Sequence, residues 1–471
     1  MQNQFNLQEI KHIHFTGIKG VAMTALAIIA KQMGKMVSGS DIDEIFPTDE
    51  TLSEAHIAVS HGFKPENVPA DTELLIYTGA HNGHSNPEVV AAAQKGIPVL
   101  PQGKALGIFM ADKRAISVAG SHGKTTTSAF VATLLESAGL HPSFAVGCGA
   151  ISHLHTSGQW GSGAYFVAEA DEYVTDPSFD STPRFLWQDP EILVITNIDF
   201  DHPDVYENLE AVQAAFAKLI RKMPDKGLVI INADDQPSVS LLPHIKQQVI
   251  TYGLEHESDF RIKNIAWQQD VTRFELHTRA GVQIYEIRIA GTHNVLNATA
   301  AIIAAHHVGL DQKHTQQGLS AFVGTKRRFE IVSEKNGKLL IDDYAHHPHE
   351  IKATLEASRK RYPNKRLVVI FQPHTYSRTQ ALLSEFANSF IVADEVVITD
   401  IYASAREQKV SQVSGETLVE KIKLYNKNVY YHPDRASVIK YISSQTHQND
   451  VIMTMGAGDI FTWLGELVTA L

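Results

Sequence analysis

One pattern recurs along most of this chain: a short apolar run ends in a small or polar residue and is followed by a segment of helix length. Apolar runs of this kind are typical of parallel strands buried on both faces, with helices covering them. The runs are IHFTG, MVSGSD, LLIYTGA, GIPVLP, AISVAG, YFVAEAD, EILVITNID, GLVIINADD, KLLIDDYA, RLVVIFQP, EVVITDI, NVYYH and DVIMTMGAGD. The pattern predicts an α/β fold.

The chain is too long for a single core, because its 471 residues exceed the size at which one hydrophobic core stops growing. The runs fall into three series, which predict domains at residues 1–111, 112–325 and 326–471. The first opens with a strand–helix–strand unit, and both outer domains are expected to be Rossmann-like. The central domain is expected to hold a parallel sheet, to which alternating segments between about 246 and 291 add a small antiparallel patch.

The central series begins with a phosphate-binding motif. In AISVAGSHGKTTTSAF an apolar strand runs into a glycine-containing loop and then a helix, so backbone N–H groups and the helix N-terminus can face phosphate oxygens. Only two residues separate the glycines, which makes the loop a shortened variant. An accidental turn is the alternative, but the flanking strand and helix favour ATP binding. The predicted ATP-binding residues here are Gly120, Ser121, His122, Gly123, Lys124, Thr125 and Thr126.

Acidic residues and a histidine follow the next strands of the same domain. Glu169 ends one apolar run, with Asp171 and Glu172 beside it, and His202 follows another. Taken alone, these are more often an ordinary acidic loop and a capping histidine. Their place after strands of the phosphate-binding domain reverses that preference, because α/β sheets assemble sites at the carboxyl ends of their strands. With the Thr125 hydroxyl, Glu169 and His202 are therefore predicted to hold Mg²⁺.

Composition limits the partners. The formal net charge of -11 and a pI near 6.1 give no general attraction to nucleic acid or to an anionic membrane. No apolar run approaches the roughly 18 residues that span a bilayer, and the amino-terminal residues lack the pattern of a signal peptide. The single cysteine, Cys148, suits a reducing compartment. We expect a cytoplasmic protein, either a monomer or a homodimer.

Further motifs lie in order along the chain: GSDID, NPEVVAA, AGSHGKTTT, EADE, TNIDFDH, GTHNVLNA, KRRFE, IDDYAHHPHE, FQPHTYSRT and GAGDI. In kind and order they resemble the Mur ligases of peptidoglycan precursor synthesis, over nearly the whole chain. The resemblance implies an ATP-dependent, ADP-forming ligase with two Mg²⁺ ions. It also implies an amino-terminal domain for a UDP-sugar, a central ATPase domain and a carboxyl-terminal domain for the incoming amino acid.

The resemblance also implies roles for single residues. Lys124 and Thr125 would meet the β- and γ-phosphates and the metal, and Lys124 and His202 would act in catalysis. Because the amine must be neutral to attack, our own hypothesis adds His346 as the catalytic base. The implied adenine contacts are His293, Asn294 and Asn297, with Arg328 and Asp343 reaching the nucleotide from the third domain. The implied UDP-sugar contacts are Gly17, Gly20, Ser40 and Asp41, and the implied amino-acid contacts are His346, His374 and Arg378. Lys19 and Ala22 depart from the glycine-rich pattern that the family usually has in the first of these loops.

The identity of the amine stays open between two branches of the family. The long segment between Glu169 and His202 resembles the recycling branch, which attaches a tripeptide to UDP-N-acetylmuramate. In contrast, FQPHTYSRT, DIYASARE and GAGDI resemble the branch that adds L-alanine, and they lie in the domain that selects the amine. L-Alanine is the favoured partner of UDP-N-acetylmuramate, and the tripeptide is the alternative. An oxidoreductase is disfavoured because GIKGVA does not match G-x-G-x-x-G, and a nucleotide switch would not consume ATP.

Overall fold

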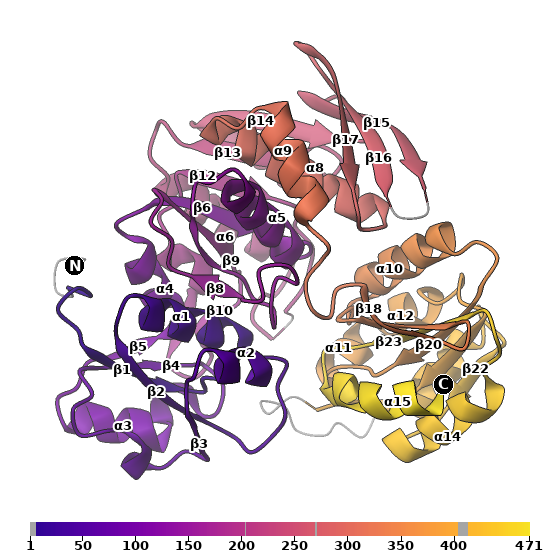
Figure 1. The fold of residues 1–471 in the computed structure, drawn as a ribbon, viewed down its shortest axis with the longest axis horizontal. Helices are drawn as coiled ribbons and strands as arrows, with labels where there is room; N and C mark the ends of the chain where they lie inside the picture. Colours follow the sequence, from indigo (N-terminus) through magenta and orange to yellow (C-terminus); the bar gives the residue numbers. More distant parts are fainter. Residues whose placement is uncertain (1–5, 203, 269–270, 404–412) are drawn as a thin grey trace. The chain divides into compact units, whose positions relative to one another are not determined.

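A computed structural model describes residues 6–202, 204–268, 271–403 and 413–471 (Figure 1). The chain divides into two compact units. The first comprises the residues up to Ile265 together with Arg273–Arg288 and Val295–Val323, and the second comprises Ala266–Thr272, Ile289–Asn294 and Gly324–Leu471. The part of the DIYASARE motif beyond residue 403 and the first five residues of the chain lie outside the described residues. The predicted domain boundaries stay predictions.

The first sheet is five-stranded and parallel, with the order β3-β2-β1-β4-β5. Its strands are β1 (His12–Thr16), β2 (Met36–Asp41), β3 (Val59–His61), β4 (Leu74–Tyr77) and β5 (Val99–Pro101). Its helices are α1 (Val21–Gln32), α2 (Asp49–Glu54), α3 (Pro87–Gln94) and α4 (Gln102–Met110), with short 3₁₀ turns η1 (Pro65–Asn67) and η2 (Gly83–Ser85). Leu74 and Ile76 pack in the same core cluster as α1 and α4, and Leu75 packs with α3 on the other face. This alternation explains why β4 is apolar throughout.

The central sheet is ten-stranded, with the order β17-β16-β15-β14-β13-β12-β6-β9-β7-β8. Its strands are β6 (Arg114–Ala119), β7 (Ser143–Ala145), β8 (Gly158–Gln159), β9 (Tyr165–Ala170), β12 (Ile192–Ile195), β13 (Leu228–Asn232), β14 (Gln248–Gly253), β15 (Phe260–Trp267), β16 (Thr272–Thr278) and β17 (Gly281–Ile287). Its helices are α5 (Lys124–Ser137), α6 (Leu209–Lys222), α7 (Gln236–Val239), α8 (Thr292–Val308) and α9 (Gln312–Ala321), with the 3₁₀ turn η4 (Leu242–His244).

The antiparallel patch of this sheet is smaller than predicted. β14 lies inside the range predicted to be antiparallel, but it pairs in parallel with β13. β16 and β17 are neighbours joined by only two residues, a connection that antiparallel strands alone allow. A separate two-stranded antiparallel hairpin, β10 (Val174–Asp176) and β11 (Asp180–Pro183), leads into the 3₁₀ turn η3 (Arg184–Trp187).

The third sheet has the order β18-β19-β23-β20-β21-β22, with only β18 antiparallel to its neighbour. Its strands are β18 (Glu330–Lys335), β19 (Lys338–Asp343), β20 (Arg366–Phe371), β21 (Glu395–Ile398), β22 (Val429–Tyr431) and β23 (Asp450–Met455). Its helices are α10 (Pro348–Arg361), α11 (Tyr376–Ala381), α12 (Leu383–Asn388), α13 (Gly415–Ile422), α14 (Arg435–Gln445) and α15 (Leu464–Ala470), with the 3₁₀ turn η5 (Asp459–Trp463).

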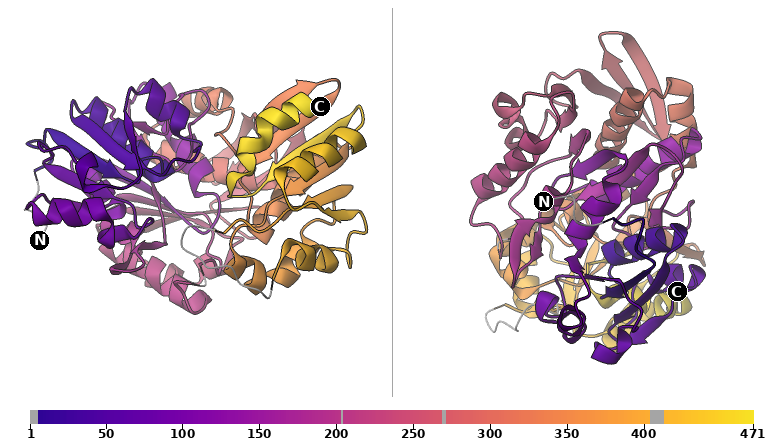
Figure 2. Two further views of the ribbon diagram at one scale, coloured as in Figure 1. Left: turned by 90° about the horizontal axis from the view of Figure 1, so that it is seen from below. Right: turned by 90° about the vertical axis from the view of Figure 1, so that its left-hand side faces the viewer.

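Helices cover both faces of the third sheet, with α14 and α15 in yellow on one of them (Figures 1 and 2). Successive strand residues such as Val368 and Val369 enter different core clusters, one shared with α14 and α15 and the other with α10, α12 and α13. The α/β fold class predicted from the apolar runs is therefore confirmed. In the part of the chain that the structure describes, no helix combines the length and the apolar character needed to cross a membrane.

Candidate active site

The phosphate loop connects β6 to α5, as the sequence predicted. Gly120 and Gly123 have φ angles of 138° and 83°, which residues with a side chain rarely adopt. A Cβ atom at Gly120 would overlap the Thr196 hydroxyl, and one at Gly123 would press on the Asn297 amide. The two glycines are therefore required both by the backbone conformation and by the close approach of neighbouring elements.

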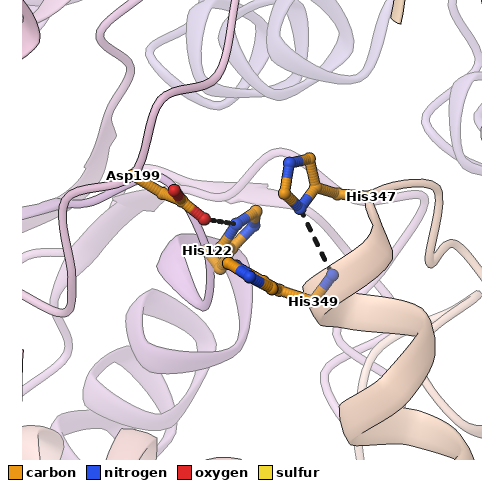
Figure 3. A group of neighbouring side chains, drawn as sticks. All are labelled: His122, Asp199, His347 and His349. Carbon is orange, nitrogen blue, oxygen red and sulfur yellow. Dashed lines mark hydrogen bonds and ion pairs between the residues drawn. The ribbon is translucent and has the colours of Figure 1, made fainter. Parts of the chain in front are cut away.

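The segment that follows β12 holds this loop in place. The Asn197 side chain accepts a hydrogen bond from the His122 amide at 2.9 Å, and its own amide group donates to the His122 carbonyl at 2.9 Å. The Ser121 hydroxyl lies 2.8 Å from the Asp199 amide, which donates to it. Figure 3 shows the His122 ring beside the Asp199 carboxylate, at 3.4 Å. Asn197 and Asp199 had no predicted role, although the motif TNIDFDH contains both.

Lys124 begins α5 and is bound to the carboxylate of Glu172, which follows β9. Its ammonium nitrogen lies 2.9 and 3.1 Å from the two Glu172 oxygens and also donates to the Gly120 carbonyl at 2.5 Å. The side chains of Lys124 and Glu172 are only 15% and 2% exposed. Burial alone would lower the pKa of Lys124, but the charges of Glu172, Asp171 and Glu169 raise it above its usual value. Lys124 is therefore a fixed cation.

Thr125 and Glu169 lie together, as predicted for a metal site. The Thr125 hydroxyl donates to a Glu169 oxygen at 3.2 Å, and the Gly147 amide donates to the other oxygen at 2.6 Å. The meeting follows from the sheet, because β6 pairs in parallel with both β9 and β12. Their carboxyl ends therefore share one edge. Thr126 is half-buried in the first turn of α5.

His202 groups with Asp171 and Glu172. One ligand atom from each of these three residues lies within 4.8 Å of the other two, and the His202 ring nitrogen is 3.7 Å from a Glu172 oxygen. Burial raises the pKa of Asp171, but the nearby charges of Arg184, Lys124 and His202 lower it overall. The predicted metal residues therefore fall into two groups. Asp171 and Glu172 lie in the second group, and the acidic run EADE could have indicated that they meet His202.

The residues predicted for adenine lie in or near the first turn of α8. Asn297 faces the phosphate loop at Gly123. The helix begins at Thr292, and the Asn294 side chain donates to the Ala290 carbonyl at 2.6 Å. The pKa of His293 is lowered to about 4 by burial and by the positive charge of Arg328. His293 is therefore neutral at pH 7.

In the second unit, Asp343 and Arg328 lie at the end of β19. The Asp343 carboxylate accepts hydrogen bonds from the amides of Phe329 and Ala345 at 2.7 and 2.8 Å. Burial raises the pKa of Asp343 to about 6, against the opposing effect of Arg328. The Arg328 guanidinium lies over the Tyr344 ring, 5.1 Å from its centre.

The residues predicted for the amino acid follow β19 and β20. The rings of His346 and His374 are edge-to-face, with their centres 6.1 Å apart. His346 Nδ1 lies 3.0 Å from the Tyr344 carbonyl and 3.2 Å from a Glu350 oxygen. Arg378 is 8% exposed in α11, and its amide donates to the Thr375 hydroxyl. The neighbouring His347 accepts a hydrogen bond from the His349 amide at 3.4 Å (Figure 3).

The residues predicted for the UDP-sugar meet at the carboxyl end of the first sheet. Here β1 and β4 are adjacent, but α1 and α3 pack on opposite faces, so the edge is a topological switch point. Gly17 has a φ of 83°, and its amide donates to the Ser40 carbonyl at 2.8 Å. Gly20 precedes α1, whose first amides face this edge. Burial raises the pKa of Asp41, which accepts the Lys19 amide at 2.7 Å.

Two side chains at this edge, Lys19 and Glu88, have contacts that the sequence did not predict. The Lys19 ammonium donates to the Glu44 carbonyl at 2.8 Å and lies 3.3 Å from an Asp49 oxygen, so it has protein partners here. Glu88, in the motif NPEVVAA, is fully buried and accepts hydrogen bonds from the hydroxyls of Ser40 and Thr16 at 2.5 and 2.8 Å. The Ser40 hydroxyl therefore points into the protein interior. The backbone of Ser40 is the part that makes contacts at the loop.

Three family models match the chain along its length. "Mur ligase family, catalytic domain" matches residues 12–114, "Mur ligase middle domain" matches 118–305, and "Mur ligase, glutamate ligase domain" matches 327–458. The matched ranges contain all the candidate site residues described above. The chain is thus similar to this family in each of its three sheets.

The chain is also similar to individual proteins along its length. The UDP-N-acetylmuramate--L-alanine ligase of Desulfitobacterium hafniense (strain Y51) is 38% identical over 96% of this chain and 98% of its own length. The crystal structure of the UDP-N-acetylmuramate-alanine ligase of Thermotoga maritima superposes with a TM-score of 0.83, at 28% identity over 98% of this chain and 99% of that one. A ligase for UDP-N-acetylmuramate and L-alanyl-gamma-D-glutamyl-meso-diaminopimelate from Neisseria meningitides is 32% identical, with a TM-score of 0.60, over 68% of this chain and 100% of that one.

Proposed function

The chain belongs to the Mur ligase family, and from that premise we propose that it joins L-alanine to the lactyl carboxylate of UDP-N-acetylmuramate at the expense of ATP. The observation that carries the choice of substrates is the similarity, at 38% identity over 96% of this chain, to a relative named for that reaction. The solved ligase named for the tripeptide is less similar, at 32% identity. L-Alanine is therefore the proposed amine.

The reaction has two steps. An oxygen of the lactyl carboxylate attacks the γ-phosphorus of ATP, the bond from that phosphorus to the bridging oxygen breaks, and ADP leaves. The nitrogen of alanine then attacks the acyl carbon of the resulting acyl phosphate. The amide bond forms, the carbon–oxygen bond to phosphate breaks, and the amine gives up a proton. The first step needs neutralisation of phosphate charge, and the second needs a proton acceptor.

Lys124 and the phosphate loop are proposed to neutralise the phosphate charge in the first step. The Lys124 ammonium is a fixed cation at the start of α5, and the loop places backbone amides at the same helix N-terminus. In the proposed complex the β- and γ-phosphate oxygens replace the carbonyl and carboxylate oxygens that Lys124 contacts here. His293, Asn294 and Asn297 are proposed to contact the adenine, and Arg328 and Asp343 the nucleotide.

The donor sets of this edge fit magnesium. Thr125 and Glu169 offer oxygen atoms, and Asp171 and Glu172 offer more beside the His202 nitrogen. Oxygen donors are those that Mg²⁺ prefers. We propose one ion at each group, and such ions, when bound, would neutralise charge on the transferring phosphoryl group. The metal is removed from the enzyme with a chelator, and Mg²⁺ is added back. If one bound ion per chain restores full activity, the second ion site is contradicted.

His346 is the proposed proton acceptor for the amine. Its Nδ1 lies beside two acceptors, the Tyr344 carbonyl and the Glu350 carboxylate. Nδ1 is therefore the nitrogen that holds the proton, and Nε2 keeps the lone pair that can accept one. His374 lies next to this ring, and Arg378 is proposed to pair with the carboxylate of alanine.

A substrate comparison tests the proposal. Purified protein is incubated with ATP, Mg²⁺ and UDP-N-acetylmuramate, and L-alanine, L-serine, glycine or the tripeptide is offered in separate reactions. Phosphate release and the mass of the product are measured. We expect the alanine adduct to form fastest, and only when both substrates are present. Turnover of the tripeptide without turnover of alanine would overturn the choice of amine.

A cytoplasmic location belongs to the same proposal, because ATP and nucleotide sugars are cytoplasmic metabolites. Detection of the protein in the soluble fraction of gently lysed cells tests it, and recovery only with the membrane or outside the cell would contradict it. Whether the enzyme is a monomer or a homodimer stays a prediction, which sedimentation of the purified chain would decide.

A further inference from the structure

The segment between Glu172 and β12 packs against the first domain. It forms the hairpin β10–β11 and the turn η3, all within the first compact unit. Four glycines of the first domain lie directly against it: Gly79 at the Thr175 carbonyl, Gly83 at the Asp176 carboxylate, Gly103 at Arg184 and Gly107 at the Trp187 carbonyl. A Cβ atom at any of the four would press on the segment. The first domain is therefore shaped to receive the hairpin.

The same segment is tied to the acidic group beside the phosphate loop. The Arg184 guanidinium bonds to an Asp171 oxygen at 2.8 Å, and the Phe185 amide donates to the Asp171 carbonyl at 2.9 Å. The Tyr173 hydroxyl donates to Asp204 at 2.8 Å. The segment between Glu172 and β12 thus connects the ATP side of the central domain with the surface of the first domain.

On the first domain the hairpin meets a turn with an unusual backbone. His81, Asn82 and Gly83 follow β4 and have φ angles of 53°, 70° and 47°. Three successive left-handed residues, two of them with side chains, are unfavourable unless the surroundings hold them. This turn lies at the topological switch point, where nucleotides bind in such sheets. The turn adjoins Gly17, whose Cβ would overlap the Thr78 side chain.

Asp176 contacts this turn from the hairpin. Its side chain is fully buried, and one oxygen accepts the His84 amide at 2.7 Å. The other accepts the amide and the hydroxyl of Ser178 at 3.0 and 2.8 Å, which fixes the carboxylate within the hairpin. The backbone of this turn also positions His81, whose ring nitrogen lies 3.8 Å from the Asp41 carboxylate.

We propose that Asp176 is a positioning residue for the nucleotide sugar: from the central domain, it fixes the left-handed turn 81–83 beside the loop that binds the UDP diphosphate. This inference rests on the proposed function for its substrate. Asp176 acts through the turn and does not touch the substrate itself. The long segment after Glu169 therefore serves the UDP-sugar end of the reaction.

The variant Asp176→Asn tests this role, because it keeps the shape of the side chain and removes its charge. We expect the KM for UDP-N-acetylmuramate to rise about tenfold, while kcat and the KM for ATP change by less than about twofold. Asp180→Asn is the matched control. Its carboxylate accepts the Thr182 amide at 2.9 Å within the same hairpin, so the KM for the nucleotide sugar should stay at the wild-type value.

A second variant and a binding measurement keep the test independent of folding and of turnover. Ser178→Ala removes one hydrogen bond to Asp176, and we expect a smaller rise of about twofold to threefold in the same KM. Calorimetric titration of UDP-N-acetylmuramate into wild type and variants should show matching losses of affinity. If wild type binds the nucleotide sugar but does not ligate alanine, the proposed function fails alone. If both variants bind it as wild type does, the role of Asp176 is wrong.

Discussion

At the scale of single residues, Lys124 of the phosphate loop already has a full set of partners. Lys124 contacts both oxygens of Glu172 and two loop carbonyls. An ammonium has only three protons to donate, so the phosphates of ATP can bind it only by replacing some of these acceptors. The exchange also releases the Glu172 carboxylate, which lies next to His202. Nucleotide binding and metal binding are therefore expected to be coupled.

The first prediction concerns the charge of Lys124. In Lys124→Ala, the transferring phosphoryl group loses a fixed donor, and we expect kcat to fall roughly 100-fold or more, as for the loss of one preorganised donor. Lys218→Ala, which removes an exposed lysine of α6, is the control and should keep wild-type kcat. Phosphate release at saturating substrates is the measurement. Near-normal turnover of a folded Lys124→Ala enzyme would rule out the proposed role.

The second prediction concerns the proton acceptor. We expect His346→Gln to lower kcat for alanine by roughly 100-fold, the lower range for general-base catalysis. The KM for ATP should stay near the wild-type value, because the change affects the amine step. Acyl phosphate formation, followed by trapping with hydroxylamine, should continue in this variant. An equal loss of acyl phosphate formation would show that His346 acts before the amine step.

The third prediction follows from the lowered pKa of His293. The unfolded histidine binds a proton below about pH 6.5, whereas folded His293 binds one only near pH 4. Between these pH values the unfolded state binds more protons than the folded state. The contribution of His293 to the free energy of unfolding is therefore complete above pH 6.5 and decreases as the pH falls toward 4. Between pH 7 and pH 4, the free energy of unfolding of His293→Gln should fall by roughly 1–3 kcal/mol less than that of the wild type. Urea unfolding at several pH values measures it, and parallel curves for the two proteins would contradict it.

At the scale of elements, glycines decide how closely the pieces of the first unit approach. Gly107 lies inside α4, where helix propensity alone would disfavour it, but a Cβ there would overlap the Trp187 carbonyl of η3. Gly465 in α15 has open space around it. The same residue type is therefore required by packing in one helix and is only a cost in backbone entropy in the other.

The fourth prediction contrasts these two glycines. Gly107→Ala should lower the free energy of unfolding by about 1–3 kcal/mol, because the added methyl group forces α4 and η3 apart. Gly465→Ala should raise it by about 0.5 kcal/mol through helix propensity. Urea unfolding followed by tryptophan fluorescence measures both. Equal effects of the two changes would contradict the close contact between α4 and η3.

At the scale of the whole molecule, the chain forms two compact units rather than one. The first holds the residues proposed for the UDP-sugar and the phosphate loop, and the second holds those proposed for the amine. Each unit has its own core clusters, so each is expected to gain and lose its packing as a separate cooperative unit.

The fifth prediction uses this division. Differential scanning calorimetry should resolve two transitions, and UDP-N-acetylmuramate at 100 times its Kd should stabilise the first unit by about 2.7 kcal/mol. The corresponding transition should rise by roughly 5 °C, while the other stays in place. L-Alanine alone should leave the transition of the first unit unchanged. A single transition that shifts as a whole would contradict independent unfolding.

The sequence alone determined the α/β class, the phosphate loop and the family. These depend on local patterns: an apolar run forms a buried strand wherever it lies, and G-x-x-G-K-T requires only a strand before it and a helix after it. The positions of Thr125 and Glu169 could be inferred too, because parallel strands bring their carboxyl ends to one edge. The extent of the antiparallel patch could not, since neighbouring alternating strands can pair in either direction.

Only the tertiary structure decided which partners these residues have. Lys124 and Glu172 are 48 positions apart, and Asp176 and His84 are 92 apart, so no local pattern predicts their contacts. Their pairing depends on the order of the strands and on where the hairpin after Glu172 packs. The same holds for Lys19, whose ammonium donates to the Glu44 carbonyl and pairs with the Asp49 carboxylate. A buried charged group needs a partner close to it in space, and the fold determines which residues lie close enough to be that partner.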